Sequence, residues 1–181
     1  MFVTITGKPG AGKTTLGKRL AALLGCPFHS AGDLLGRMAQ ERGMRIEELD
    51  AVHGEHVELD HAFEQYQAEV ARKEGSGVFD GWVAFVAIPS SVKVFLDVSW
   101  EVAARRIFLH PRPDEERVRS VEEQEALLRE RFEKNRRRFL KAYGVDLLDV
   151  TQYDIVFKTD GVSPEEGARE LLSRIKKLKQ K

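Results

Sequence analysis

The sequence contains a single cysteine, Cys26, and no apolar run that approaches the length of a membrane-spanning helix. One thiol cannot form a disulfide within the chain, so the small secreted scaffolds that depend on disulfides are excluded. The first residues also lack the basic segment and apolar core of a secretory signal. We therefore expect a cytoplasmic protein that does not enter a membrane.

A surplus of charge of either sign is also missing, because 29 Lys and Arg residues balance 29 Asp and Glu residues. Without a global positive field, the chain is not expected to bind nucleic acid or a membrane surface. Its 181 residues, of which 42% are hydrophobic, suit one globular domain with a sizeable buried core. We therefore expect a single domain over residues 1–181 that acts as a monomer on small molecules.

What the sequence does contain is an alternation of short β-rich runs and amphipathic helices. The runs predicted as strands are residues 2–6, 78–80, 92–98 and 153–159. Three helices are predicted in the first half, at residues 13–24, about 33–42 and around 59–70. Three more follow: one is capped by Ser99 and stops before Pro111, one runs from residue 120 to about 142, and the last begins after Ser163. Ser30, Gly32 and Asp33 are expected to form the loop before the second helix. This order predicts an α/β fold of three layers, in which helices cover both faces of a parallel sheet and ligands bind at the carboxyl ends of the strands.

Between the first strand and the first helix, residues 7–14 fit the pattern G-x-x-x-x-G-K-S/T. Its glycines let backbone N–H groups surround one anion, and the N-terminus of the following helix adds partial positive charge. The residues expected to bind the phosphates of ATP are Gly7, Lys8, Pro9, Gly10, Ala11, Gly12, Lys13, Thr14 and Thr15. A glycine-rich turn without a ligand is the alternative, but the strand before it and the helix after it favour a P-loop NTPase fold, with Lys13 reaching the β and γ phosphates.

Asp80 ends the expected strand 78–80, and it would lie beside the glycine loop if that strand neighbours the first one. The Thr14 hydroxyl and the Asp80 carboxylate would then bind the Mg²⁺ ion that bridges the phosphates, directly or through water. The structural alternative is that Asp80 forms a turn before Gly81. We expect Lys13 and Asp80 to be catalytic, and Thr14 and Asp80 to be the metal ligands.

The chain lacks the guanine-reading N-K-x-D pattern, which argues against a GTPase switch and favours a compact small-molecule kinase. Further segments follow the glycine loop in a specific order and spacing. These are Ser30 to Asp33, Met38 to Met44, Leu59-Asp60 through Gln67, Asp80-Gly81, Arg105-Arg106-Ile107, Tyr143 to Asp146, and Tyr153-Asp154. By these segments the chain resembles the archaeal-type cytidylate kinases, within the larger group of nucleoside monophosphate kinases, over nearly its whole length.

The resemblance implies transfer of the γ-phosphoryl group of ATP to CMP or dCMP. It also implies a helical acceptor-binding segment at about residues 30–75 and a lid at about residues 110–138. The residues assigned to the acceptor are Ser30, Asp33, Arg37, Asp60 and Trp82. Arg131 and Arg138 lie seven residues apart, on one helical face, and are expected to neutralise charge during transfer. Because the acceptor oxygen is already anionic, alignment and charge neutralisation suffice without a strong general base.

Several positions where the family has arginine carry other residues here, namely Gly36, Tyr66, Trp82, Ala103 and His110. Each lost charge-assisted phosphate contact costs about 1.5–3 kcal/mol, so two further hypotheses stay open. One is a kinase for another nucleotide or for a small hydroxylated metabolite, whose hydroxyl Asp33 would hold. The other is a nucleotide-dependent binding module without an acceptor site, which would use the basic residues 129–141 for a protein or RNA partner. The Trp82 indole would either stack on an acceptor ring or pack in the interior.

Overall fold

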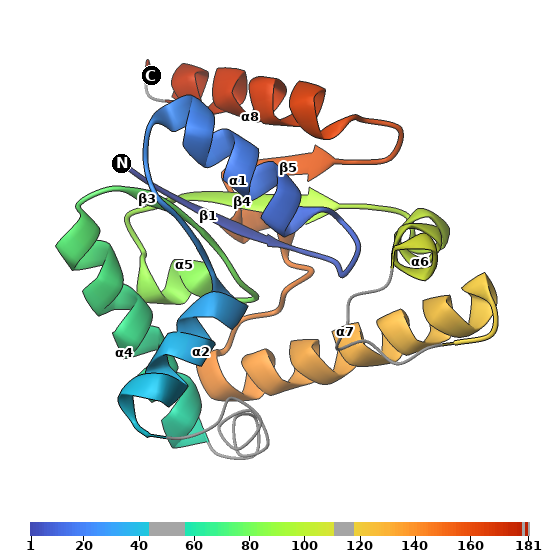
Figure 1. Ribbon diagram of the computed structural model, residues 1–181, viewed down its shortest axis with the longest axis horizontal. Coiled ribbons are helices and arrows are strands. Elements are labelled where there is room, and N and C mark those ends of the chain that lie inside the picture. Colours follow the sequence, from blue (N-terminus) through green and yellow to red (C-terminus); the bar gives the residue numbers. More distant parts are fainter. Residues whose placement is uncertain (44–56, 111–117, 179, 181) are drawn as a thin grey trace.

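The computed structural model describes residues 1–43, 57–110, 118–178 and 180, and its centre is a parallel sheet (Figure 1). The five strands have the order β2-β3-β1-β4-β5. They are β1 Phe2–Gly7, β2 Phe28–Ser30, β3 Gly77–Asp80, β4 Val92–Asp97 and β5 Ile155–Lys158. The four strands expected from the sequence are present, with ends shifted by at most two residues. The sequence did not predict β2, because three residues are too few to show an alternation.

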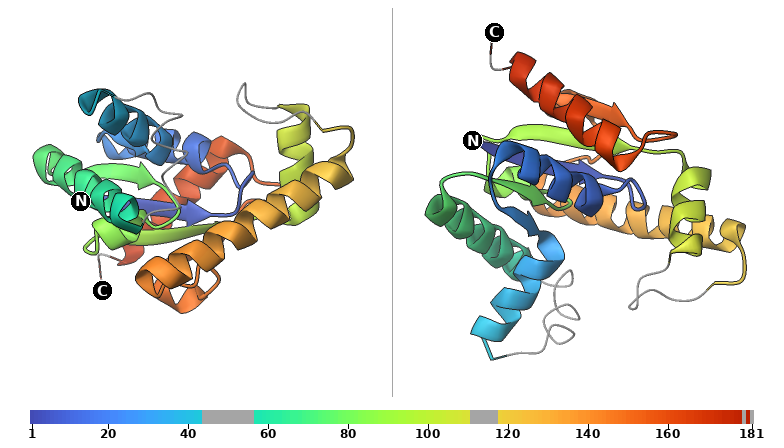
Figure 2. Two further views of the ribbon diagram at one scale, coloured as in Figure 1. Left: turned by 90° about the horizontal axis from the view of Figure 1, so that it is seen from below. Right: turned by 45° about the horizontal axis from the view of Figure 1, so that its top comes forward.

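Helices cover both faces of this sheet, which confirms the expected α/β fold. They are α1 Lys13–Leu24, α2 Ala31–Glu41, α4 Val57–Glu74, α5 Ala84–Ala87, α6 Trp100–Leu109, α7 Val121–Tyr143 and α8 Pro164–Leu178, with a 3-10 turn at Val150–Gln152. Helices α1 and α8 lie together on one face, and α5 and α7 lie on the other (Figures 1 and 2). The carboxyl end of β3 lies beside the first turn of α2 (Figure 1).

Serine caps begin four of the described helices, and one of them corrects an expectation. Ser99, Ser120 and Ser163 accept hydrogen bonds from the N–H groups three residues later, as predicted. Ser30 Oγ likewise accepts from the Asp33 N–H at 3.1 Å, so α2 already begins at Ala31. Gly32 and Asp33 therefore lie in the first turn of α2 and not in a loop before it. The sequence also missed α5, whose four residues are shorter than a helical period can reveal.

The two faces of β1 are buried in different ways. Val3 and Ile5 are fully buried among the apolar residues of α1 and α8, such as Leu20. Thr4 and Thr6 on the opposite face are buried too, and their hydroxyls are satisfied by hydrogen bonds: Thr4 with the Ser91 hydroxyl at 2.8 Å, and Thr6 with the carbonyls of Gly81 and Trp82, both at 3.2 Å. Threonine combines strand propensity with this polar contact, which fixes the turn after β3 against β1.

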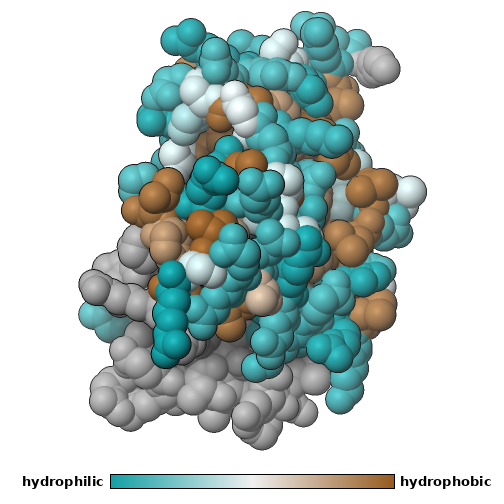
Figure 3. All heavy atoms as spheres, turned by 90° about the vertical axis from the view of Figure 1, so that its right-hand side faces the viewer, coloured by the Kyte–Doolittle hydropathy of each residue, from teal (hydrophilic) through white to brown (hydrophobic). Residues whose placement is uncertain are grey.

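On the face that Figure 1 has at its right, hydrophilic residues surround apolar residues that lie in separate small groups (Figure 3). Among the described residues, no helix combines the length and the hydropathy needed to cross a bilayer.

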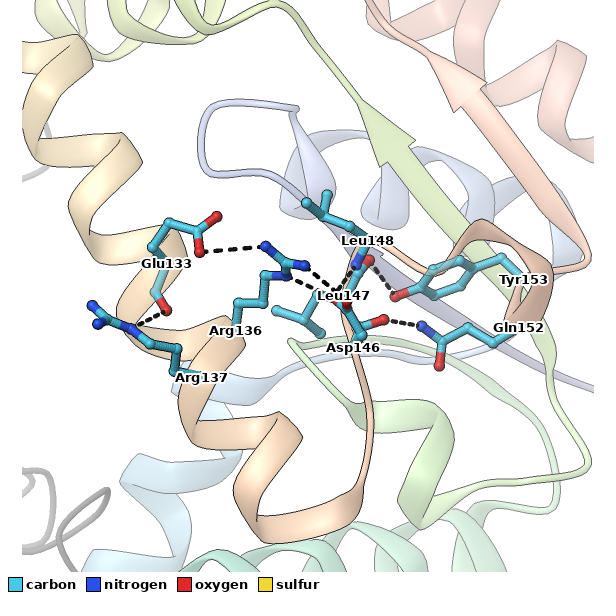
Figure 4. A network of polar contacts seen from close by, with 8 residues as sticks. All are labelled: Glu133, Arg136, Arg137, Asp146, Leu147, Leu148, Gln152 and Tyr153. Atoms are coloured by element: carbon cyan, nitrogen blue, oxygen red, sulfur yellow. Dashed lines mark hydrogen bonds and ion pairs between the residues drawn. The ribbon is translucent and has the colours of Figure 1, made fainter.

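A polar network fastens the end of α7 to the chain that follows it (Figure 4). Arg136 donates from Nε and Nη2 to the two oxygens of Asp146, at 2.6 and 2.8 Å. Asp146 also accepts the Leu148 N–H at 3.0 Å through its side chain. The Tyr153 hydroxyl donates to the carbonyl of Leu147, which is fully buried. Because this bidentate ion pair favours the charged carboxylate, it lowers the pKa of Asp146 from 3.8 to about 2.

Replacing Asp146→Asn is expected to lower the free energy of unfolding at pH 7 by about 1 kcal/mol, since the pair is only partly buried. A lowered pKa contributes stability above the unfolded value, and that contribution is lost as the pH falls from about 4 to about 2. Urea unfolding at pH 7, 4 and 3 should therefore show the difference between parent and variant shrinking. The exposed Glu130→Gln on the same helix is the control. A difference that stays constant over this pH range would contradict the assignment.

Candidate functional site

The glycine loop between β1 and α1 has the backbone that the sequence pattern requires. Gly10 and Gly12 have φ angles of 75° and 85°, a left-handed conformation that other residues rarely adopt. A Cβ at Gly10 would also come within 2.9 Å of the backbone of Ala103, so the loop lies directly against α6. Gly12 caps α1 without any side-chain hydrogen bond, which leaves the N-terminal N–H groups of α1 for an anion.

Lys13 lies across this loop. Its Nζ donates to the carbonyls of Gly7 at 2.8 Å and Lys8 at 3.1 Å, and it lies 5.3 Å from the centre of the Trp82 ring. The Lys8 ammonium turns the other way, to Asp97 at 2.6 Å. Lys13 is therefore the loop cation that faces the turn after β3, at the position from which a P-loop lysine reaches phosphate.

Asp80 lies beside the loop because β1 and β3 are neighbours, with Ile5 paired to Asp80. The Thr14 hydroxyl donates to Asp80 Oδ2 at 2.8 Å, and the Ala31 N–H donates to Oδ1 at 3.3 Å. A hydroxyl and a carboxylate are the hard oxygen ligands that Mg²⁺ prefers, so this pair fits the expected ion. No group of three or more His, Cys, Asp or Glu side chains that could hold a metal occurs among the described residues. An ion at this pair would therefore complete its shell with water and phosphate oxygens.

A pocket of about 970 Å³ opens next to Trp82, between α2, α4, α7 and the turn after β3. Four residues expected at the site line it: Asp60, Trp82, Arg131 and Arg138. The other three acceptor candidates do not line this pocket: Ser30 caps α2, while Asp33 and Arg37 lie exposed on that helix. The Trp82 ring packs against Phe132 and Phe139 of α7, with ring centres 5.9 and 6.4 Å apart. Trp82 therefore forms the wall between Lys13 and the pocket.

The two arginines expected in the lid have different surroundings on α7. Arg138 forms an ion pair with the buried Asp60 of α4, with Nε 3.0 Å from Oδ2. Arg131 is exposed and lines the same pocket. Both face the acceptor side of the fold, on a continuous helix. Residues 111–117 of the expected lid lie outside the described residues.

The sequence reading missed two polar residues of α4 and one arginine of α6. Glu64 and Gln67 line the pocket, and the Gln67 amide donates to Glu64 Oε2 at 2.8 Å. Burial, with the nearby charge of Asp60, raises the pKa of Glu64 to about 8, although Arg138 acts in the opposite direction. Arg106 supports the loop by donating to the Gly10 carbonyl at 3.2 Å. The spacing of Asp60, Glu64 and Gln67 at i, i+4 and i+7 was the available signal, because it puts three polar groups on one helical face.

Acidic and basic side chains therefore line the two long walls of the pocket. Helix α4 contributes the acidic side chains of Asp60 and Glu64. Helix α7 contributes basic side chains from Arg131, Lys134, Arg137, Arg138 and Lys141. Such a polarised pocket suits a ligand that is anionic at one end and offers hydrogen-bonding groups at the other.

The Asp60–Arg138 pair should matter for stability, because Asp60 is only 3% exposed. Asp60→Asn is expected to lower the free energy of unfolding by about 2 kcal/mol at pH 7, since it removes one member of a mostly buried pair. The loss is smaller than for a fully buried pair because Glu64 would ionise and replace Asp60 beside Arg138. Urea unfolding measures it, with the exposed Glu69→Gln on the same helix as the control. Equal free energies of unfolding for both variants and the parent would show that the ion pair does not stabilise the fold.

The chain is similar in sequence to known kinases. Residues 2–161 match the sequence profile of the cytidylate kinase-like family. The cytidylate kinase of Methanothrix thermoacetophila is 34% identical over 180 residues, which cover 99% of this chain and 100% of that one. The cytidylate kinase of Archaeoglobus fulgidus is 36% identical over 183 residues, with coverages of 99% and 98%.

Solved structures show the same architecture. Shikimate kinase from Bacteroides thetaiotaomicron has a TM-score of 0.65 to this chain at 23% identity, and the alignment covers 100% of this chain and 99% of that one. A likeness at this identity speaks for the kinase fold alone. The family match and the two cytidylate kinases carry the assignment further: the chain belongs to the cytidylate kinase-like family, and it is a kinase.

Proposed function

We propose that this protein transfers the γ-phosphoryl group of ATP to a nucleoside monophosphate, with CMP or dCMP as the acceptor and Mg²⁺ as the cofactor. The observation that carries the proposal is the position of Trp82, which touches the P-loop lysine on one side and lines the acceptor pocket on the other. A donor phosphate at Lys13 and an acceptor phosphate in the pocket would meet at this ring. The relatives named cytidylate kinase support the choice of acceptor.

The chemistry asks the protein for alignment and positive charge. The loop N–H groups and Lys13 would hold the donor phosphates, and Thr14 with Asp80 would hold Mg²⁺, which neutralises charge on them. The acceptor phosphate is already a nucleophile, so the site needs no strong base beside it. Arg131 and Lys134 on the pocket wall would attract that phosphate and neutralise charge as the γ-phosphoryl group moves.

The pocket is lined by positive charge even though this chain lacks arginine at several family positions. Trp82 and Gly36 contribute none, but the α7 wall supplies its own basic side chains facing the same space. Ala103 is fully buried and packs against Gly10, so this position lies under the glycine loop and away from the pocket. The acceptor phosphate would thus be held from α7 more than from α2.

The other two hypotheses from the sequence have less support. A kinase for a hydroxylated metabolite would rest on the solved shikimate kinases, which share only the fold at such low identity. Asp33, the residue proposed to hold a metabolite hydroxyl, is exposed on α2 and does not line the pocket. A binding module without an acceptor site would not need the pocket of about 970 Å³ next to the loop.

The test is a coupled assay of ADP formation with each of CMP, dCMP, UMP, AMP and GMP, in the presence and absence of Mg²⁺. We expect ADP to form only when acceptor and metal are both present, and fastest with CMP or dCMP. Lys13→Ala should lower the rate by about 100-fold or more, because it removes a charge that stabilises the transferred group.

Lys18→Ala is the matched control, since Lys18 is an exposed lysine of the same helix one turn further on. It should leave the rate within about a factor of two, because a surface substitution seldom changes more than a few tenths of a kcal/mol. No acceptor-dependent ADP with any of the five nucleotides, or equal rates for the two lysine variants, would refute the proposal.

A further inference from the structure

The far wall of the pocket carries a polar pair that the phosphoryl transfer does not use. Gln67 is only 1% exposed, yet it lines the pocket, and its amide nitrogen is held by Glu64 Oε2. Its Oε1 has no hydrogen-bond partner among the described residues. Turning the amide round would only exchange the unsatisfied atom, because Glu64 engages one end in either orientation. A buried amide end without a partner costs free energy, which is a reason to look for a ligand group that satisfies it.

The surroundings of Glu64 on α4 favour a protonated carboxyl near neutral pH. Burial and the charge of Asp60 raise its pKa to about 8. A protonated carboxyl can donate through its O–H group as well as accept, which an ionised carboxylate cannot. Glu64 and Gln67 therefore present one donor next to one acceptor.

The groups that face Glu64 come from several elements. Asp60 is its neighbour on α4, and Arg138 and Tyr143 approach it from α7. The remaining ionisable side chains of the pocket are Arg131, Lys134, Arg137 and Lys141, all on α7. The pocket residues of α2, of the turn after β3 and of the start of α5 are Ala31, Gly32, Leu35, Gly81, Trp82, Val83 and Ala84, none of which titrates. Arg138, which is paired with Asp60, lowers the pKa of Glu64, but burial and the charge of Asp60 outweigh it.

We propose that Glu64 and Gln67 read the base of the acceptor and select cytosine over uracil. This inference rests on the proposed function, and it specifies which wall of the pocket recognises the base. Cytosine presents a ring nitrogen, N3, that accepts a hydrogen bond, next to an amino group that donates. The Glu64 O–H would donate to N3, and the amino group would donate to Gln67 Oε1. Because that oxygen is covered, the amide has to turn toward the pocket when the base enters.

Uracil in the same position has the opposite pattern. Its N3 carries a hydrogen that would meet the hydrogen of Glu64, and its O4 would meet the Gln67 oxygen. Uracil would fit only if the Glu64 proton and the Gln67 amide both turned round. Sites built around hydrogen bonds to a substrate NH group discriminate against analogues that lack the group, since their own polar atoms are left unpaired. The polarity of the pocket agrees with this orientation: a base at α4 directs the phosphate toward the basic wall of α7 and Lys13.

The experiment measures kcat/KM for CMP and for UMP at pH 7 in the parent and in Glu64→Ala, Glu64→Gln and Gln67→Met. Glu64→Ala and Gln67→Met should each lower kcat/KM for CMP by about 10- to 100-fold and UMP much less, so the ratio between the two acceptors falls toward one. Glu64→Gln should stay within a few-fold of the parent for CMP, because an amide offers the same donor and acceptor as a protonated carboxyl.

The pH dependence separates base reading from a purely structural role. In the parent, KM for CMP should rise as the pH passes about 8 and Glu64 loses its proton, while KM for ATP stays level. Glu64→Gln should abolish the rise, because its amide does not titrate. Glu69→Gln, an exposed acid on the same helix, is the control and should keep it. Thermal unfolding of each variant checks that the fold is intact.

Three outcomes would overturn the inference: equal losses for CMP and UMP in Glu64→Ala and Gln67→Met, a rise in KM that persists in Glu64→Gln, or a parent that uses UMP as well as CMP. Each of these requires an active parent. A parent that forms no acceptor-dependent ADP refutes the proposed function itself, so the two failures are distinguishable.

Discussion

The site depends on the parallel pairing of β1 with β3. This register brings Asp80 level with Ile5, so the carboxylate lies beside the glycine loop and accepts the Thr14 hydroxyl. The same pairing places the turn at Trp82 against Lys13 and anchors it through the buried Thr6 hydroxyl. One backbone register thereby joins the glycine loop, the Thr14–Asp80 pair and the wall of the pocket.

Helix α7 forms the opposite side of the site. Two of its arginines hold it in place through ion pairs, one partly exposed and one with a buried carboxylate. Arg136 pairs with Asp146 at the partly exposed end of the helix, and Arg138 pairs with the buried Asp60 of α4. The aromatic rings of Phe132 and Phe139 fill the space beneath Trp82. With α7 fixed in this way, its basic side chains face the acid and amide groups of α4 across the pocket. One side of the pocket is therefore basic, and the other offers carboxyl and amide groups for hydrogen bonds.

Most of the regular structure could be predicted from local signals. The capping serines at 99 and 120 and the apolar periods gave the helices, and the four longer strands were found within two residues. The short elements β2 and α5 were missed because three or four residues carry no measurable period, and their conformation is set by the neighbours they pack against. The start of α2 was misplaced because Ser30 was taken as part of a loop, whereas its hydroxyl caps the helix directly.

The sequence by itself determined the glycine loop between β1 and α1, since its glycines, Lys13 and Thr14 are contiguous and its conformation follows from local backbone geometry. It also determined the family, through motifs spread along the chain in a fixed order. Only the tertiary structure decided which residues share the acceptor pocket, because α2, α4 and α7 meet there from distant parts of the chain. It showed that Ser30, Asp33 and Arg37 do not line the pocket and that Glu64 and Gln67 do. The raised pKa of Glu64 and the unsatisfied amide of Gln67 arise from burial that no sequence pattern records.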